Sequence, residues 1–280
     1  MRKYLIFIGI GLIILTSFFI GFNPEKEPLL IVRAELPPFE YYKNDSLVGI
    51  HVEITEKILS ELKIPYEIQL MDFDSALRTL SFGEADMMFS VLHSKSRESY
   101  VDYTDEMISY KTGDPFPETT LWIEQYALFH QSSKKDELDL SSIEAIRNNN
   151  YRVGLIDGYV YPDDLTSQNL NFYSFLTVED SIKGLNKGEV DILISDVFPS
   201  ESTIKSFGLE DEIQSSYNIF YYSPNYIVFS KNSKYKNLKK VKEMFYKELI
   251  RLKEEENLHN ILYKKYLNIT FDEAYNKLIY

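Results

Sequence analysis

The sequence predicts an α/β protein built from two similar lobes, and two observations support this fold class. Residues 77–90 and 182–195 are near copies of each other, sharing Leu, Gly-Glu, Asp, three apolar residues and Ser at the same spacing. In addition, continuous apolar runs alternate with amphipathic stretches along most of the chain, a pattern typical of parallel α/β units. We therefore expect two α/β lobes, each containing one copy of the repeat.

Each copy of the repeat predicts a helix, a stop and a buried strand. Gly83 and Gly188 can take the left-handed conformation that ends a helix, and the apolar run after each glycine indicates a buried strand. Asp86 and Asp191 are expected to form hydrogen bonds at the strand entrance. Because ligands bind at the carboxyl ends of strands in open α/β sheets, the two units predict a shared cleft.

The first lobe begins with strands and helices in alternation. The apolar run 29–32 indicates a strand, the pattern over 52–62 an amphipathic helix, and 66–70 a second strand. An Asp within 71–74 is placed to cap a helix over 75–82, and the first repeat strand follows. This β-α-β-α-β order predicts parallel strands.

The second lobe repeats this order after a segment rich in Gly, Pro and Thr, 107–122, which we expect to cross between the lobes. Its predicted strands and helices cover residues 124–131, 140–148, 151–156, 171–175 and 178–186, before the second repeat strand. Two extended runs, 217–222 and 226–230, then flank Ser223-Pro224-Asn225. Helices are predicted over 238–255, 258–267 and 271–279.

Composition excludes several classes of function. The chain has 280 residues and 44% apolar content, which is ample for packed cores. Its formal net charge of −13 argues against nucleic acid, and against an anionic membrane surface, as partners of the folded part. The four histidines lack metal-ligand spacing, no Cys is present and no phosphate-binding Gly loop occurs, so we expect no metal and no cofactor.

The amino terminus indicates export. Met1-Arg2-Lys3 precedes a nearly continuous apolar run, 4–22, which is the pattern of a signal peptide over residues 1–22. The run is also about long enough to span a bilayer, so cleavage and retention as a membrane anchor both stay open. Either outcome places the bulk of the chain on the periplasmic or extracellular side of the membrane.

A series of short motifs carries a resemblance to a known family. These motifs are Pro37-Pro38-Phe39, Leu47-Val48-Gly49, Met71-Asp72-Phe73, Gly83-Glu84-Ala85-Asp86, Ser94-Lys95-Ser96-Arg97, Val101-Asp102-Tyr103-Thr104 and residues 190–196. In this order and spacing, the chain resembles the family 3 extracellular solute-binding proteins, the amino-acid-binding type of periplasmic receptor. The resemblance covers about residues 29–267.

The resemblance implies an α/β, type II periplasmic-binding-protein fold, in which two lobes are joined by two hinge strands and a solute is trapped as the lobes close. It places lobe I at 29–108 and 223–280 and lobe II at 112–220. The two crossings are then expected near 107–111 and 221–225.

The resemblance also implies two principal binding residues. Arg97 stands where the family has an Arg that forks onto the ligand α-carboxylate, although it could instead pair with Glu98 or Asp102 at the surface. Asp196 stands where the family has an Asp that holds the ligand ammonium, although it could instead cap the segment that follows.

Five further residues are candidates for ligand contact. Phe73 matches an aromatic residue that packs on the ligand in relatives, and Ser90 ends the first repeat strand. Glu35 lies near the end of the first strand, where it could select a cationic or hydroxylated ligand. Gly158 can offer its backbone to an anion at a helix opening, with Tyr159 beside it.

We expect a monomeric binding protein, not an enzyme, that hands a small polar, amino-acid-like or carboxylate-bearing solute to an ABC transporter permease. Leu92 stands where the family usually has a hydroxyl-bearing residue, and Gly158-Tyr159-Val160, with its bulky Tyr159, stands where relatives have a Gly-Thr-Thr-like segment. These departures leave a larger or less standard ligand open. One alternative is a membrane-anchored sensory module. Another is a dehydratase-like enzyme on the same fold, with Glu35 and Asp196 as the obvious acid–base candidates.

Overall fold

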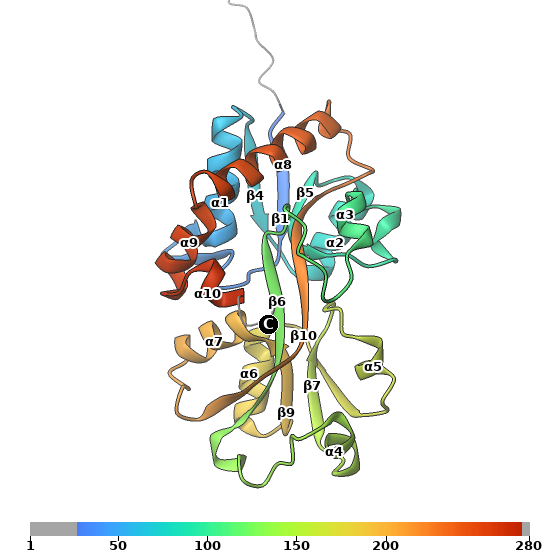
Figure 1. The fold of residues 1–280 in the computed structure, drawn as a ribbon, viewed down its shortest axis with the longest axis vertical. Coiled ribbons are helices and arrows are strands. Elements are labelled where there is room, and N and C mark those ends of the chain that lie inside the picture. The colour runs from blue at the N-terminus through green and yellow to red at the C-terminus, as the bar shows by residue number, and fades with distance from the viewer. Residues whose placement is uncertain (1–26, 276–280) are drawn as a thin grey trace, which may run out of the picture.

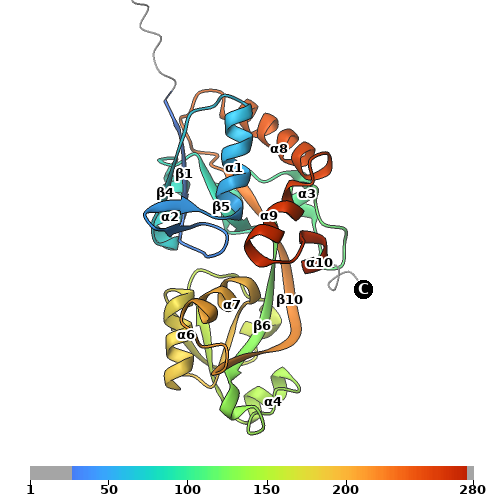
Figure 2. The same ribbon diagram turned by 90° about the vertical axis from the view of Figure 1, so that its left-hand side faces the viewer.

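The computed structural model describes residues 27–275, which form two lobes connected by long strands (Figures 1 and 2). The predicted signal peptide or anchor, 1–22, lies outside the described residues. Between residues 27 and 275, no helix is both long and apolar enough to cross a membrane.

One eight-stranded sheet runs through both lobes, in the order β4-β1-β5-β10-β6-β9-β7-β8. Its strands are β1 (Leu29–Arg33), β4 (Tyr66–Leu70), β5 (Met87–Leu92), β6 (Trp122–Gln131), β7 (Arg152–Ile156), β8 (Asn171–Phe175), β9 (Ile192–Asp196) and β10 (Ile213–Phe229). Pairing is parallel at the two ends of the sheet and antiparallel where β10 and β6 meet their neighbours. These two strands therefore form the hinge between the lobes (Figure 1).

Lobe I is the upper lobe in Figure 1 and has the predicted β-α-β-α-β order. Its elements are β1, α1 (Ile50–Glu61), β4, α2 (Phe73–Phe82) and β5, with a hairpin of β2 (Tyr41–Lys43) and β3 (Ser46–Val48) before α1. The last helices of the described chain, α8 (Leu238–Glu254), α9 (Leu258–Leu267) and α10 (Phe271–Tyr275), return to this lobe. Asp72 caps α2 as predicted, because its side chain accepts a hydrogen bond from the Ser75 amide.

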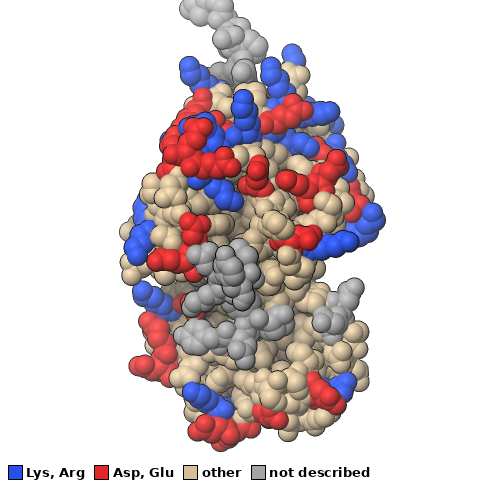
Figure 3. Space-filling model, viewed as in Figure 1, with Lys and Arg blue, Asp and Glu red and all other residues tan. Residues whose placement is uncertain are grey.

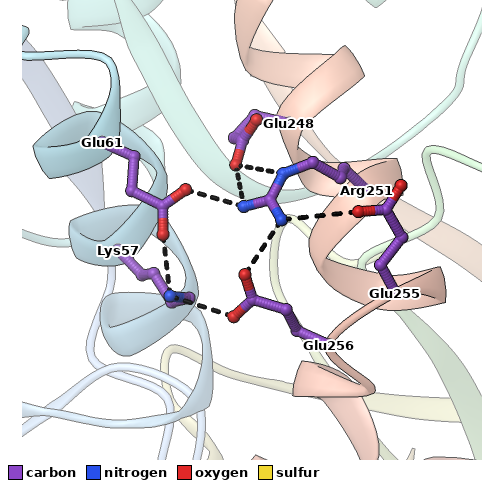
Figure 4. Close-up of polar contacts among 6 residues, drawn as sticks. All are labelled: Lys57, Glu61, Glu248, Arg251, Glu255 and Glu256. Atoms are coloured by element: carbon purple, nitrogen blue, oxygen red, sulfur yellow. Dashed lines mark hydrogen bonds and ion pairs between the residues drawn. The ribbon is translucent and has the colours of Figure 1, made fainter.

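A network of ion pairs connects helix α8 to helix α1 (Figure 4). Arg251 contacts Glu61 at 2.7 Å and Glu248 at 2.5 Å, and Lys57 contacts Glu256 at 3.1 Å. Exposed ion pairs of this kind contribute little one by one, but a network holds the geometry better than isolated pairs do.

Lobe II contains β7, β8 and β9 with four helices (Figure 1). The helices are α4 (Ile143–Asn148), α5 (Asp163–Thr166), α6 (Val178–Lys187) and α7 (Val197–Ser206). Ser142 caps α4 and Thr177 caps α6, each by accepting a backbone hydrogen bond.

The two repeats have the same local structure. Gly83 ends α2 with φ 72°, and Gly188 ends α6 with φ 74°. The aspartate after each glycine accepts a hydrogen bond from the adjacent parallel strand: Asp86 from the Leu30 amide and Asp191 from the Arg152 amide. The repeated sequence therefore encodes the helix stop and a link between neighbouring strands.

The structure corrects two expectations about the hinge. The crossing expected near 107–111 is instead the helix α3 (Asp105–Ser109), which Thr104 caps, and β6 makes the crossing later in the chain. The run 217–222 and all but the last residue of the run 226–230 belong to one strand, β10. Pro224 lies just beyond the end of pairing with β5 and pairs with Ile123 of β6. The lobe boundaries given above stay a prediction.

Candidate functional site

Two adjoining cavities occupy the cleft between the lobes. The inner cavity, of about 20 Å³, is lined by Arg33, Phe73, Ser90, Leu92, Arg97, Glu124, Gly158, Tyr159, Val160 and Asn225. The outer groove, of about 560 Å³, shares Arg33, Phe73 and Tyr159 with it and continues between the lobes. Both cavities take residues from lobe I and lobe II, so they lie where lobe movement would enclose a ligand.

Arg97 lies at the base of the cleft, in a single turn of 3₁₀ helix (Arg97–Ser99) that follows β5. Its side chain is buried, with 7% of the residue exposed. The guanidinium donates to the carbonyl of Leu92 at 3.2 Å and to that of Gly158, across the cleft, at 3.3 Å. Among the described residues these partners are neutral, so the cation has no carboxylate of its own.

Phe73 packs against lobe II and between two cations. The guanidinium carbons of Arg33 and Arg97 lie 4.6 and 5.7 Å from the centre of its ring. The ring also approaches Gly158 so closely that a Cβ built there would lie 2.6 Å from Phe73 Cδ1. Gly158, with φ 79°, is therefore required both for its backbone conformation and for this close contact.

Glu124, a residue that the sequence prediction missed, is the buried carboxylate of the inner cavity. It is 6% exposed, and Asn225 Nδ2 donates to its Oε2 at 3.5 Å. Burial raises the pKa of Glu124 to about 7, while Arg33 and Arg97 act in the opposite direction. The available signal was an acidic residue inside the apolar run that forms β6.

Asp196, the predicted ammonium contact, does not line either cavity. It caps α7: its Oδ1 accepts from the Phe198 amide at 3.1 Å, and its Oδ2 accepts from the Gln125 amide at 2.7 Å. Burial, reinforced by the nearby Glu124, raises its pKa well above the usual value. These contacts fit the capping alternative, and a ligand contact for Asp196 stays a prediction.

Ser90 joins the inner cavity to a buried polar network in lobe I. Ser90 Oγ lies 2.9 Å from His51 Nδ1, and Glu40 Oε2 lies 2.6 Å from the same nitrogen. Arg33 Nε donates to Glu40 Oε1 at 3.2 Å. A nucleophilic serine needs one ring nitrogen while the acid holds the other. Here Ser90 and Glu40 both contact Nδ1 of His51, so the three residues do not form a catalytic triad. Glu40 instead holds Arg33 in position through its hydrogen bond with Arg33 Nε.

The remaining predicted residues lie in the same cleft. Glu35 lines the outer groove, where its Oε1 accepts from the Tyr42 amide at 3.1 Å. Tyr159 lines both cavities and stacks on Tyr126, with ring centroids 6.4 Å apart. The structure thus brings Phe73, Ser90, Arg97, Gly158 and Tyr159 together at the inner cavity, places Glu35 next to it and leaves Asp196 outside.

The outer groove combines apolar walls with acidic side chains. Leu36, Leu70, Met71, Ile156 and Leu176 are among its apolar lining residues. Its acidic lining residues come from both lobes and are Glu35, Asp72, Asp74, Asp157 and Asp180, against Arg33 as the one basic residue of the lining. The groove therefore suits a ligand segment with an apolar stem and a positive end. Within residues 27–275, no group of three His, Asp or Glu side chains is arranged to hold a metal ion.

Comparison with known proteins finds similarity to amino-acid receptors. Residues 29–117 match the model of the bacterial extracellular solute-binding proteins, family 3. The arginine-binding extracellular protein ArtP of Bacillus subtilis (strain 168) is 29% identical over 82 residues, which are 29% of this chain. The aligned part spans about a third of that relative's length, 32%.

Solved structures share the fold over most of the chain. A histidine kinase sensor domain with similarity to periplasmic binding proteins has a TM-score of 0.71 and 16% identity, covering 87% of this chain and 96% of its own. The arginine-, lysine-, histidine-binding protein ArtJ of Geobacillus stearothermophilus has a TM-score of 0.66 and 16% identity, with coverages of 90% and 99%. AbpA of Streptococcus pneumoniae, bound to L-arginine, has a TM-score of 0.65 and 19% identity, and the match covers 91% of this chain and 97% of AbpA. These likenesses confirm the predicted periplasmic-binding-protein fold.

Proposed function

We propose that this relative of the family 3 extracellular solute-binding proteins captures an amino acid with a cationic side chain and presents it to an ABC transporter. The observation that carries the proposal is that Arg97 and Glu124, of opposite charge, line one cavity between two lobes. A zwitterion has the complementary pair of charges. Capture on the outer side of the membrane is consistent with the exported family and with the basic and apolar start of the chain.

Each end of the zwitterion has a partner in the cleft. Arg97 offers a planar fork of N–H donors, and exchanging the carbonyls of Leu92 and Gly158 for a carboxylate would turn neutral hydrogen bonds into charge-assisted ones. Glu124 would accept from the ammonium, which supplies the neighbouring positive charge that a buried carboxylate needs.

The outer groove supports a cationic side chain. Its apolar walls would cover a methylene stem, and its five carboxylates would surround a positive end. Several of the similar proteins are described as arginine-binding, which agrees with this charge pattern. We therefore place the side chain of the ligand between Glu35 on lobe I and Asp157 on lobe II.

A sensory role is the second candidate. The similarity to a histidine kinase sensor domain favours it, since that domain has the same two-lobe fold. The ligand site would be the same in both roles, and only the partner that reads lobe closure would differ. Identifying whether residues 4–22 remain on the exported protein separates an anchored module from a released one.

Calorimetric titration of the purified protein with L-arginine, L-lysine, L-leucine and L-glutamate tests the proposal. We expect saturable binding of the two basic amino acids and none of glutamate. Arg97→Ala should weaken binding at least about 100-fold, or about 3 kcal/mol, because a charge-assisted pair is lost. Arg78→Ala, at an exposed site on α2, is the control and should bind normally. Tight glutamate binding without arginine binding would overturn the ligand class.

The same titration examines the ammonium contact. Asparagine caps helices well, so Asp196→Asn should preserve affinity if Asp196 only caps α7. If Asp196 holds the ammonium directly, affinity should fall about as far as it does in Glu124→Gln. Equal losses in the two variants would restore the original prediction for Asp196.

A further inference from the structure

A separate cavity lies beside hinge strand β10 and shares no lining residue with the inner cavity of the cleft. This hinge cavity, of about 380 Å³, is lined by residues that follow β5 in lobe I, including Tyr110 and Lys111, and by residues of β10, including Ser223 and Tyr226. Asn225 lines the inner cavity of the cleft, whereas Tyr226 lines the hinge cavity. The volume is in the range of small-molecule sites.

Two tyrosine hydroxyls at this cavity have no hydrogen-bond partner. Tyr226 is 1% exposed, and neither its hydroxyl nor the buried hydroxyl of Tyr110 makes a hydrogen bond with the described part of the chain. A buried hydroxyl without a partner costs free energy, so such groups normally have one. Burial raises the pKa of both phenols, which therefore remain O–H donors at neutral pH.

The charge of the cavity lining is opposite to that of the protein as a whole. The chain has a net charge of −13, yet none of the lining residues identified in the described chain carries a carboxylate. Lys111, an exposed residue, contributes an ammonium group that forms no ion pair within residues 27–275. His93 lines the cavity too, and its Nε2 lies 2.9 Å from Glu98.

The acidic residues near the hinge cavity, Asp114 and Glu106, are not among its lining residues. Asp114 accepts from the Lys111 backbone amide at 3.1 Å, and it acts on the pKa of Tyr110 from outside the lining. Glu106 acts in the same way on Tyr226. Neither acid belongs to the identified cavity lining, whose polar residues include Tyr110, Tyr226 and Lys111.

We propose that the hinge cavity is a second ligand site, which takes a small oxyanion of the phosphate or carboxylate class. The hydroxyls of Tyr110 and Tyr226 donate to the anion, and Lys111 supplies the positive charge. Because its walls come from lobe I and from a hinge strand, an occupant there contacts the part of the molecule about which the lobes move. This inference does not depend on the ligand proposed for the cleft.

Calorimetric titration of the full-length protein with inorganic phosphate tests the site. A second titration with acetate shows whether the site prefers phosphate or a carboxylate. We expect saturable phosphate binding that weakens at least tenfold in the double variant Tyr110→Phe/Tyr226→Phe. Arg97→Ala, which alters the cleft, should leave phosphate affinity unchanged. Phosphate binding that is lost in Arg97→Ala but kept in the double variant would overturn the proposal, as would no binding to the parent protein.

Thermal unfolding without ligand gives an independent check. Tyr226→Phe removes a hydroxyl without a partner and should leave Tm unchanged or higher. The matched control is Tyr246→Phe, which removes a hydroxyl that donates to the Ile227 carbonyl at 2.7 Å and should lower Tm. If Tyr226→Phe lowers Tm as far as the control does, the hydroxyl has a protein partner and the proposed site is wrong.

Discussion

Glu124 is the residue whose chemistry matters most in the cleft. It is buried beside Arg33, Arg97 and Asn225, and its charge also acts on Asp196 on the lobe II side. Within residues 27–275, no hydrogen bond or ion pair joins Glu124 to a cation, so burial dominates and raises its pKa to about 7. A ligand ammonium would reverse that balance by favouring the ionised carboxylate.

We expect the affinity for arginine to rise with pH between 5 and 7, by up to about tenfold per unit, and then to level off. Below pH 7 the free protein holds a proton on Glu124, and binding of a cation must release it. Calorimetry at several pH values, in two buffers of different ionisation enthalpy, measures both the affinity and the released proton. Glu124→Gln should bind weakly and without this pH dependence; tighter binding at pH 5 than at pH 7 would contradict the assignment.

The raised pKa also affects stability, with a defined sign. Between pH 4.5 and 7 the folded state binds more protons at Glu124 than the unfolded state does. This carboxyl group therefore makes the ligand-free protein less stable as the pH rises through that window. Substitution by Gln removes this contribution.

At the scale of the elements, the two repeats provide a matched experiment. Gly83 and Gly188 both end helices in the left-handed conformation, but their surroundings differ. A Cβ at Gly83 would lie 2.1 Å from the backbone oxygen of Asn232, whereas a Cβ at Gly188 would meet no atom within 4 Å.

Gly188→Ala should therefore lower the free energy of unfolding by about 1–2 kcal/mol, the cost of the left-handed conformation for a residue with a Cβ. Gly83→Ala should lower it by about 3 kcal/mol or more, since the backbone around Asn232 must also move. Urea unfolding of the two variants measures the difference. Equal losses would show that the chain at Asn232 shifts freely.

At the scale of the whole molecule, the lobes are closed on each other. The Arg97–Gly158 hydrogen bond and the packing of Phe73 on Gly158 join lobe I to lobe II, and the inner cavity of about 20 Å³ holds little more than a water molecule. An amino acid cannot enter this state. Binding therefore requires the hinge strands β6 and β10 to let the lobes separate.

Fluorescence energy transfer between labels on the two lobes can detect this opening. The chain has no Cys, so Ser60→Cys on α1 and Ser141→Cys in lobe II give two unique, exposed positions. We expect a broad distribution of distances without ligand, which reflects opening and closing of the lobes, and a narrower one with arginine. A distribution that arginine leaves unchanged would contradict the closing clamp, provided that calorimetry shows the labelled protein still binds.

The charged side chains on the surface and those in the cleft have different roles. Basic and acidic side chains are interspersed over the upper lobe in Figure 3. This mixing explains why the overall charge of −13 says little about the cleft, where a few buried groups decide the chemistry.

The sequence by itself determined the α/β units, the two repeats with their glycine stops and an aspartate cap within residues 71–74. These features depend on local periodicity and on residues close in the chain. Only the tertiary structure decided that Glu124 faces the cavity while Asp196 bonds to the Gln125 and Phe198 amides, and that β6 makes the first crossing. The physical reason is that the direction of a strand side chain, and the partners of a buried carboxylate, depend on which segments from the other parts of the chain pack beside it.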